Sequence, residues 1–176
     1  MSNTVFSGKA YVTGDNTTSY LISYPSRWRE CGADAEKLGD WMLEPLVPEF
    51  KDVPGAFKKL GYEVLISGVD LGGGFKSNDD PALTVKGAGI KLIIAEDINR
   101  IFFRNCINLG NAVLECPGIT KMVKEGDIVS ADIATGVVKN ETTNETLQGK
   151  PLSELAVSII LADGLIPYWK KKLAEK

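Results

Sequence analysis

A run of three glycines, Gly72 to Gly74, constrains this chain most, because it stands between a strand-like and a helix-like segment. The preceding residues, Val64 to Val69, are a short apolar run typical of a buried strand. The residues that follow can begin a helix at Asp79 or Asp80. Such a turn lets a ligand approach backbone amides near a helix N-terminus, where the helix dipole favours an anion. The sequence predicts an anion site here with Lys76 as its cation, and a tight connection without ligand is the structural alternative.

Hydrophobic periodicity predicts further elements along the chain. Strands are expected at Ser7 to Val12, Tyr20 to Ile22 and Lys91 to Ala95, and in a meander over 128–133, 137–139 and 145–148. Helices are expected from Asp34 to Leu43, at Ala56 to Leu60, from Pro81 onward, from Asp97 to Leu109, and from Glu154 to Asp163, where Gly164 ends the helix. Residues 23–31 and most of 45–61 are expected to be loop. The pattern favours one mixed α/β domain over residues 1–176.

Composition excludes several classes of function. The hydrophobic content of 44% is ordinary for a globular chain, and the longest apolar runs are far shorter than the roughly 20 residues that span a bilayer. A net charge of -3 argues against a nucleic-acid partner. The first residues lack the pattern of a signal peptide, so we expect a cytoplasmic chain.

The residues that could carry nucleophilic or metal chemistry are few. The chain contains no histidine, which excludes serine-histidine and cysteine-histidine mechanisms. Cys31, Cys106 and Cys116 are too widely spaced for a disulfide framework or a metal centre within this chain. The basic run Lys170 to Lys172 is interpreted as a solvated helix end.

Several motifs together carry a family likeness. They are Ser7 to Val12 followed by Gly14-Asp15-Asn16, then Ala88 to Glu96, Arg100-Ile-Phe-Phe-Arg-Asn-Cys-Ile-Asn-Leu-Gly110, and Ala162 to Tyr168. Over most of its length the chain resembles the small subunit of 3-isopropylmalate dehydratase and the matching mobile domain of aconitase. The resemblance implies a single swivelling β/β/α domain of the aconitase C-terminal-domain type, with a mixed, barrel-like sheet and flanking helices.

The sequence departs from this family at its catalytic positions. In the family the glycine turn continues Ser-Ser-Arg, where the first serine is the catalytic base and the serine-arginine pair holds a substrate carboxylate. Phe75, Lys76 and Ser77 stand at these places, and Ser19 and Tyr20 replace the family's Thr-Asp pair. A phenyl ring cannot accept a proton, so the base is absent from its usual position.

The resemblance also implies a function and a partner. The chain is expected to be the small subunit of a heteromeric hydro-lyase that acts on a hydroxy-dicarboxylate such as an alkylmalate. The implied partner is a large subunit that carries a 4Fe-4S cluster, with no metal bound by this chain. A regulatory or scaffolding paralogue without catalytic activity is the alternative, since both family motifs are altered.

The candidate site residues fall into two groups. Gly72, Gly73, Gly74, Lys76 and Ser77 are expected to bind substrate, and the missing base is left open among Lys76, Ser77 and Tyr20. A lysine offers a point charge where the family uses the planar fork of an arginine.

The second group, Arg27 and Arg29, lies where the relatives contact the variable part of their substrate. Arg27 and Arg29 flank Trp28 and could bind a diacid or stack on a planar group, and surface pairing with Glu30 is the plainer alternative. Arg104 and Asn108 belong to the family motif at 100–110, and their spacing places them on one face of the predicted helix. They could line the pocket, contact the partner subunit or form hydrogen bonds with neighbouring loops.

Overall fold

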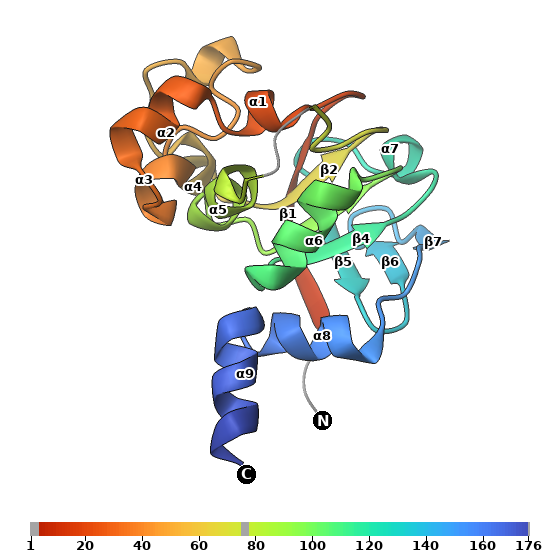
Figure 1. Cartoon of the computed structure of the whole chain (residues 1–176). Coiled ribbons are helices and arrows are strands. Elements are labelled where there is room, and N and C mark those ends of the chain that lie inside the picture. The colour runs from red at the N-terminus through yellow and green to blue at the C-terminus, as the bar shows by residue number, and fades with distance from the viewer. Residues whose placement is uncertain (1–3, 75–77, 176) are drawn as a thin grey trace.

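The computed structural model describes residues 4–74 and 78–175, and a seven-stranded sheet forms its centre (Figure 1). The strand order is β4-β3-β2-β1-β5-β6-β7. The strands are β1 (Val5–Val12), β2 (Tyr62–Ser67), β3 (Leu92–Ala95), β4 (Ala112–Glu115), β5 (Ile128–Asp132), β6 (Val137–Asn140) and β7 (Thr146–Gln148). The pairs among β1 to β4 are parallel, whereas β5 to β7 form the antiparallel meander predicted from the sequence. The carboxyl ends of four neighbouring strands therefore meet at one edge of the sheet.

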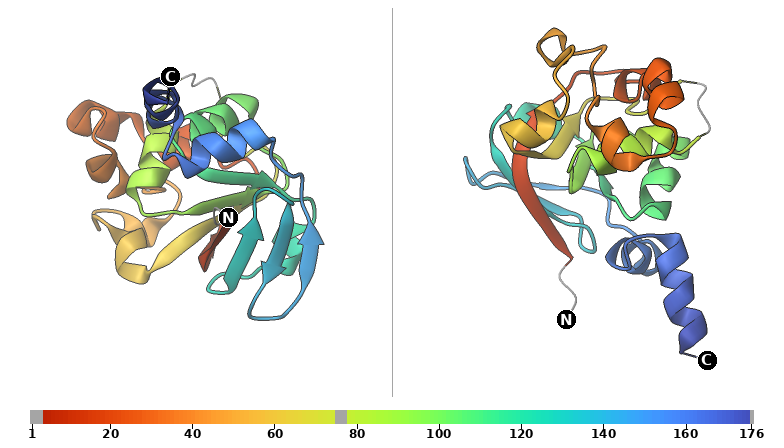
Figure 2. Two further views of the ribbon diagram at one scale, coloured as in Figure 1. Left: turned by 90° about the horizontal axis from the view of Figure 1, so that it is seen from below. Right: turned by 90° about the vertical axis from the view of Figure 1, so that its left-hand side faces the viewer.

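Helices cover both faces of this sheet (Figures 1 and 2). They are α1 (Ser19–Ile22), α2 (Pro25–Cys31), α3 (Ala35–Gly39), α4 (Ala56–Leu60), α5 (Asp80–Gly87), α6 (Arg100–Asn108), α7 (Ile119–Met122), α8 (Glu154–Leu161) and α9 (Leu165–Ala174), with a short 3-10 turn at Pro48–Phe50. Among the described residues, no helix is both long and apolar enough to cross a membrane.

Alternate residues of the parallel strands face two separate cores. Leu65 of β2 and Ile93 of β3 belong to the core under α1, α4, α5 and α6. Val64 and Ile94, one position away, belong to the core under α7 and α8. This alternation is what a sheet buried on both faces requires.

The sheet curls until its first and last strands in space approach each other. The Lys150 N–H, just beyond β7, donates a 2.8 Å hydrogen bond to the Glu115 carbonyl at the end of β4. Gly149 permits this approach, because a Cβ there would lie 2.7 Å from the same carbonyl oxygen. The curl explains the expected barrel-like core.

Two predictions in the first 31 residues are wrong. The apolar run Tyr20 to Ile22 belongs to the helical turn α1, since three residues are too few for periodicity to separate helix from strand. Residues 25–31, predicted as loop, form α2. Pro25 is its first residue, where a missing N–H costs no helical hydrogen bond.

Other boundaries shift for identifiable reasons. Asp34 caps α3 as predicted, accepting a hydrogen bond from the Lys37 N–H, but the helix ends at Gly39, short of the predicted Leu43. Gly39 lies directly against Gly87 of α5, where a Cβ would be 2.0 Å from backbone. Helix α7 was not expected from the sequence. Beyond Gly164 the chain continues as α9, whose exposed end carries Lys170 to Lys172 as predicted.

Candidate functional site

Two turns come together at the carboxyl edge of the parallel strands. The opening turn, residues 13–18, follows β1, and the glycine turn, residues 68–74, follows its neighbour β2. The Gly72 N–H donates a 2.8 Å hydrogen bond to the Thr17 carbonyl, and the Asn16 N–H donates one of 2.8 Å to the Val69 carbonyl. The two turns are therefore held as one unit by their backbones.

Asp15 fastens the base of this unit. Its Oδ1 accepts a 2.9 Å hydrogen bond from the Val69 N–H. A Cβ at Gly68 would lie 1.8 Å from that same oxygen, so only glycine lets the carboxylate approach. The Gly-Asp-Asn turn thus has a structural role in this chain.

Gly72 is required for two independent reasons. Its φ of +74° is in the left-handed region, which L side chains rarely adopt. A Cβ at this position would also lie 2.3 Å from Cγ of Phe102, a buried residue of α6. Helix α6 therefore sets the path of the glycine turn.

Ser19 ties the two turns together from the first residue of α1. Its hydroxyl donates a 2.7 Å hydrogen bond to the Gly72 carbonyl, and its N–H donates a 2.9 Å bond to the Gly73 carbonyl. Sequence reasoning noted Ser19 only as a departure from the family's Thr-Asp pair. That position in the motif was the signal that could have identified it.

Tyr20 lies beside the last described glycine of the turn. A Cβ at Gly74 would be 3.8 Å from two carbons of the Tyr20 ring and 3.9 Å from Cβ of Thr18. The structure thus brings the candidate Tyr20 together with Gly74. Lys76 and Ser77, with Phe75, lie outside the described residues.

Asn78 lies two residues before the start of α5. The side-chain amide of Asn105 on α6 donates a 3.1 Å hydrogen bond to the Asn78 carbonyl, which is the loop contact considered for this motif. Asp79 occupies the predicted N-cap position of α5, but within the described residues its side chain makes no capping bond. Arg104 and Asn108 of α6 are both exposed.

Arg27 is held in an internal ion-pair network. Its guanidinium donates to both carboxylate oxygens of Glu44 at 2.8 and 2.6 Å, and to Glu30 at 2.9 Å. The guanidinium also stacks on the indole ring of Trp41, with its Cζ 3.7 Å from the ring centroid. Its aromatic partner is therefore Trp41, and not the adjacent Trp28 noted in the sequence. The hydrogen bonds from Arg27 lower the pKa of Glu44, although partial burial opposes the shift.

A cavity of about 570 Å³ opens beside this network. Its lining combines apolar side chains with charged ones of both signs: Tyr24, Ser26, Arg27, Glu30, Glu44, Pro45, Pro48, Lys51 and Asp52. Among the described residues, none of the glycine turn lines this cavity. Arg29 is exposed on α2 and is likewise absent from the lining.

Glu96 follows β3 at the same edge of the sheet. Its carboxylate accepts hydrogen bonds from the Gly118 N–H at 2.5 Å, the Thr120 N–H at 3.0 Å and the Thr120 hydroxyl at 2.6 Å. Burial raises the pKa of Glu96, but these three bonds together outweigh it and leave the pKa lowered. Glu96 therefore fastens the start of α7, a role that no sequence motif had indicated.

Two of the three cysteines are buried in separate cores. Cys106 belongs to the core under α1, α4, α5 and α6, and Cys116 belongs to the core under α7 and α8. Both side chains are fully buried. Burial raises the pKa of Cys116 to about 11 and that of Cys106 further still, so neither thiol ionises readily. Over residues 4–74 and 78–175, no group of three or more His, Cys, Asp or Glu could hold a metal ion.

Comparison with known proteins gives consistent results. No family model matches the sequence. The 3-isopropylmalate dehydratase small subunit of Pyrobaculum aerophilum is 42% identical over 163 residues, which cover 93% of this chain and 96% of the relative. The isopropylmalate/citramalate isomerase small subunit of Methanocaldococcus jannaschii is 37% identical over 173 residues, covering 97% of both. A crystal structure of 3-isopropylmalate dehydratase (LeuD) from Methanocaldococcus jannaschii superposes with a TM-score of 0.84 and 26% identity, covering 97% of this chain and 96% of that one.

Proposed function

This chain belongs to the family of 3-isopropylmalate dehydratase small subunits, and from that premise we propose that it closes over an iron-sulfur large subunit and supplies contacts to the carboxylates of a hydroxy-dicarboxylate. The superposition confirms the expected fold, a β/β/α domain of the aconitase C-terminal-domain type. The chain is thus one subunit of a heteromeric hydro-lyase. The identity of the substrate, the cluster and the site residues belong to the proposal.

One observation carries the proposed site. The glycine turn is held by three backbone carbonyl contacts, from Gly72 N–H to Thr17 and from Ser19 to Gly72 and Gly73. These bonds fix the peptide planes of the turn before any ligand arrives. Two amides of the turn are already used, since the Gly72 and Gly73 N–H groups donate to the Thr17 and Asp70 carbonyls. The anion contact is therefore assigned to the Gly74 end of the turn, at the carboxyl edge of a parallel sheet, where anions are often bound.

The proposal divides the work between the two chains. The described residues of this chain do not fit a cluster, so we assign the 4Fe-4S group to the large subunit, where it would supply Lewis-acid chemistry. This chain would orient a carboxylate through the Gly74 end of the glycine turn and through the Lys76 ammonium, while Gly72 and Gly73 shape the turn. Tyr20, Lys76 and Ser77 are the candidates for handling the proton, and Tyr20 lies next to Gly74.

A co-purification experiment tests this proposal. The chain is co-expressed anaerobically with the large subunit encoded in the same genome, and hydration of a panel of unsaturated diacids is assayed. We expect a stable complex whose KM rises at least about tenfold in Lys76→Ala. Lys124→Ala, at an exposed turn away from the glycine turn, serves as the matched control and should leave KM unchanged.

The outcomes separate two functions. Failure to form any complex contradicts the proposal. A tight complex that hydrates none of the diacids favours the second candidate, a regulatory or scaffolding paralogue. The replacement of the family's Ser-Ser-Arg by Phe75, Lys76 and Ser77 is the observation that keeps this candidate open.

A further inference from the structure

The glycine turn contains a carboxylate that the fold itself does not use. Asp70 lies two residues before Gly72, and its side chain is partly exposed. Within residues 4–74 and 78–175, this carboxylate makes no hydrogen bond and no ion pair. At the same edge of the sheet, by contrast, the carboxylate of Asp15 bonds the Val69 N–H, and that of Glu96 accepts three bonds from the start of α7. The Asp70 carboxylate is therefore available to a ligand.

The backbone of the turn holds this carboxylate against Gly73. The Gly73 N–H donates a 3.3 Å hydrogen bond to the Asp70 carbonyl, which closes residues 70–73 into a tight turn. A Cβ at Gly73 would lie 2.1 Å from Oδ2 and 2.6 Å from Oδ1 of Asp70. Glycine at position 73 thus leaves room for the carboxylate, one residue away from the Gly74 end where the anion contact is assigned.

Local stability does not account for an aspartate at this position. The φ of Asp70 is +55°, in the left-handed region. Aspartate tolerates this region when its side chain forms a local hydrogen bond, and no such bond is present among the described residues. Glycine would adopt the same φ without steric cost. An uncommon backbone conformation of this kind is typical of functional positions.

Asp70 also lines a cavity of about 310 Å³ at the amino end of α6. The other lining residues are Asp97, Ile98, Asn99, Arg100 and Ile101. The volume is near the lower end of the range for small-molecule sites and suits a small acid. Arg100 is exposed, and within the part of the chain that the structure describes it forms no ion pair, so its guanidinium could hold a carboxylate in bidentate fashion. A dicarboxylate could thus contact both Arg100 and the Gly74 end, with Asp70 beside it.

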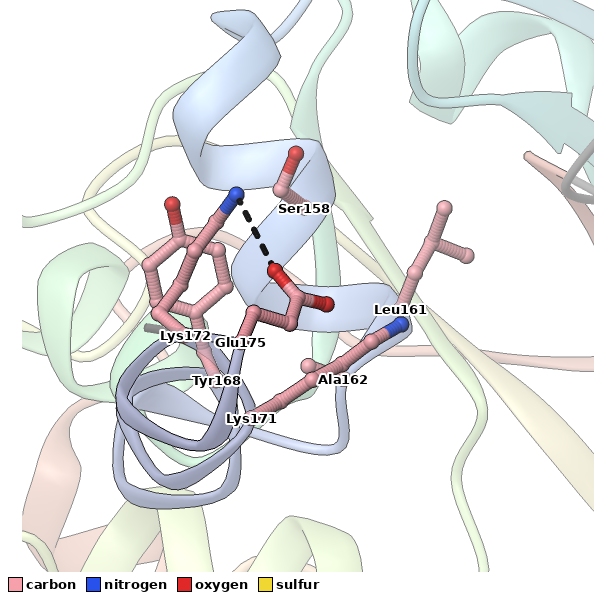
Figure 3. Close-up of a pocket in the computed structure, with 7 residues that line it drawn as sticks. All are labelled: Ser158, Leu161, Ala162, Tyr168, Lys171, Lys172 and Glu175. Carbon is pink, nitrogen blue, oxygen red and sulfur yellow. Dashed lines mark ion pairs between the residues drawn. The ribbon is translucent and has the colours of Figure 1, made fainter.

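The cavity between α8 and α9 does not compete for this role (Figure 3). Its Lys172 is paired with Glu175 at 3.9 Å. The corner between α8 and α9 packs on the carboxyl end of α6, since a Cβ at Gly164 would lie 2.8 Å from the Asn108 carbonyl. The glycine turn packs at the opposite end of the same helix, where the Asn99 N–H bonds the Leu71 carbonyl.

The expected reaction needs a group that accepts a proton from carbon. The sequence left this group open among Lys76, Ser77 and Tyr20. An ammonium has no electron pair to offer, and a hydroxyl must lose its own proton before it can accept another. A carboxylate accepts a proton directly. The position of Asp70 before the glycines, outside the altered motif, gave no sign of this role in the sequence.

We propose that Asp70 is the catalytic base of this subunit, an assignment that rests on the proposed function. In dehydration, a carboxylate oxygen of Asp70 takes the proton from the carbon beside the hydroxyl-bearing carbon. The electrons of the broken C–H bond form the C=C bond, and the C–O bond breaks with its electrons on the departing hydroxide. The proton on Asp70 and this hydroxide together make the one water that is released. In hydration, the Asp70 carboxyl group returns the proton to carbon.

Asp70→Asn in the anaerobic complex with the large subunit tests the assignment. Asparagine keeps the size of the side chain and tolerates a positive φ, so only the proton acceptor is lost. The variant should lower kcat at least about 100-fold and leave KM within about threefold. Asp52→Asn is the matched control, because Asp52 is an exposed aspartate with a φ of +59° in a loop outside the glycine turn. It should leave both constants unchanged.

Asp70→Gly adds a measurement that a purely structural role would not affect. Glycine adopts the left-handed φ without strain, and formate can enter the space left by the side chain. Formate should raise the kcat of Asp70→Gly at least about tenfold, and it should not raise that of the wild type or of Asp52→Gly. Urea unfolding checks that each variant is folded.

The outcomes distinguish this assignment from the proposed function. A folded Asp70→Asn complex that keeps the wild-type kcat, or that changes KM alone, overturns the assignment and leaves the proposed function standing. An Asp70→Gly complex that formate does not activate has the same meaning. A wild-type complex that hydrates none of the diacids overturns both.

Discussion

The buried hydroxyl of Ser19 donates a 2.7 Å hydrogen bond to the carbonyl of Gly72, which lies 53 residues further along the chain. Because the Ser19 N–H also bonds the next carbonyl, one residue fixes two consecutive peptide units of the glycine turn. Ser19 is therefore expected to position the turn without itself contacting the reacting atoms.

Ser19→Ala should destabilise the chain by about 1–3 kcal/mol, because it leaves a buried carbonyl without its donor. It should also raise KM in the reconstituted enzyme more than it lowers kcat. Ser19→Thr retains the hydroxyl and should restore both properties. A Ser19→Ala enzyme with unchanged KM would contradict the positioning role, and urea unfolding together with steady-state kinetics decides the matter.

Gly72→Ala should cost more than backbone conformation alone explains. The substitution meets a left-handed φ, worth roughly 1–2 kcal/mol, and a clash with Phe102, worth roughly 1–3 kcal/mol. Gly126 has a φ of +90° with nothing within 4 Å of its Cβ position, so Gly126→Ala isolates the first cost. If the two variants lose the same unfolding free energy relative to the wild type, the Phe102 side chain moves aside at little cost.

Arg27 and Glu44 should be strongly coupled in a double-mutant cycle. The two side chains are only 19% and 11% exposed, and both oxygens of Glu44 are engaged. A coupling free energy of about 1–3 kcal/mol is expected from Arg27→Ala and Glu44→Gln, and Arg27→Lys should not restore it because lysine lacks the planar fork.

Arg29→Ala is the companion test on the same helix. Arg29 is exposed, so its loss should leave the unfolding free energy unchanged. A rise in KM for this variant would support the predicted diacid contact, whereas an unchanged KM would remove Arg29 from the substrate site.

Glu96 should make stability depend on acid pH. Its pKa is lowered in the folded chain by the bonds to Gly118 and Thr120, despite the opposing effect of burial. A carboxylate of this kind contributes stability above its unfolded pKa of about 4.3 and loses it as the pH falls through the lower folded value. Glu96→Gln should therefore be less stable at neutral pH and show a flatter decline below about pH 4.5 in urea unfolding. An identical pH profile for wild type and variant would contradict this assignment.

Local patterns predicted the elements that sequence periodicity can specify. Apolar patterning predicted strands at Val64 to Val69 and Lys91 to Ala95, and the structure has strands at Tyr62–Ser67 and Leu92–Ala95. The helix predicted from Glu154 to Asp163 is present but ends at Leu161, and Gly164 is the N-cap of α9. The glycine turn between strand and helix is also where the sequence placed it. Helices α1 and α2 were missed because one is a single turn and the other starts at a proline.

Contacts between distant residues could not be predicted from local patterns. The pairing of Arg27 with Glu44 depends on the chain folding back over 17 residues, and the approach of Phe102 to Gly72 depends on how α6 packs. The family motif marked the position of Ser19 but contained no indication of its bond to Gly72. The roles proposed for Lys76 and Ser77 stay predictions.

The bond between Lys150 and Glu115 has a consequence for assembly. It joins the borders of the sheet, and the two outermost strands are only four and three residues long. Short, partly joined borders offer little template for adding a strand from another molecule, which is how sheet proteins avoid amyloid-like growth. A chain in which the hydrogen bond between Lys150 and Glu115 is lost is therefore the one expected to add strands from other molecules and form fibres.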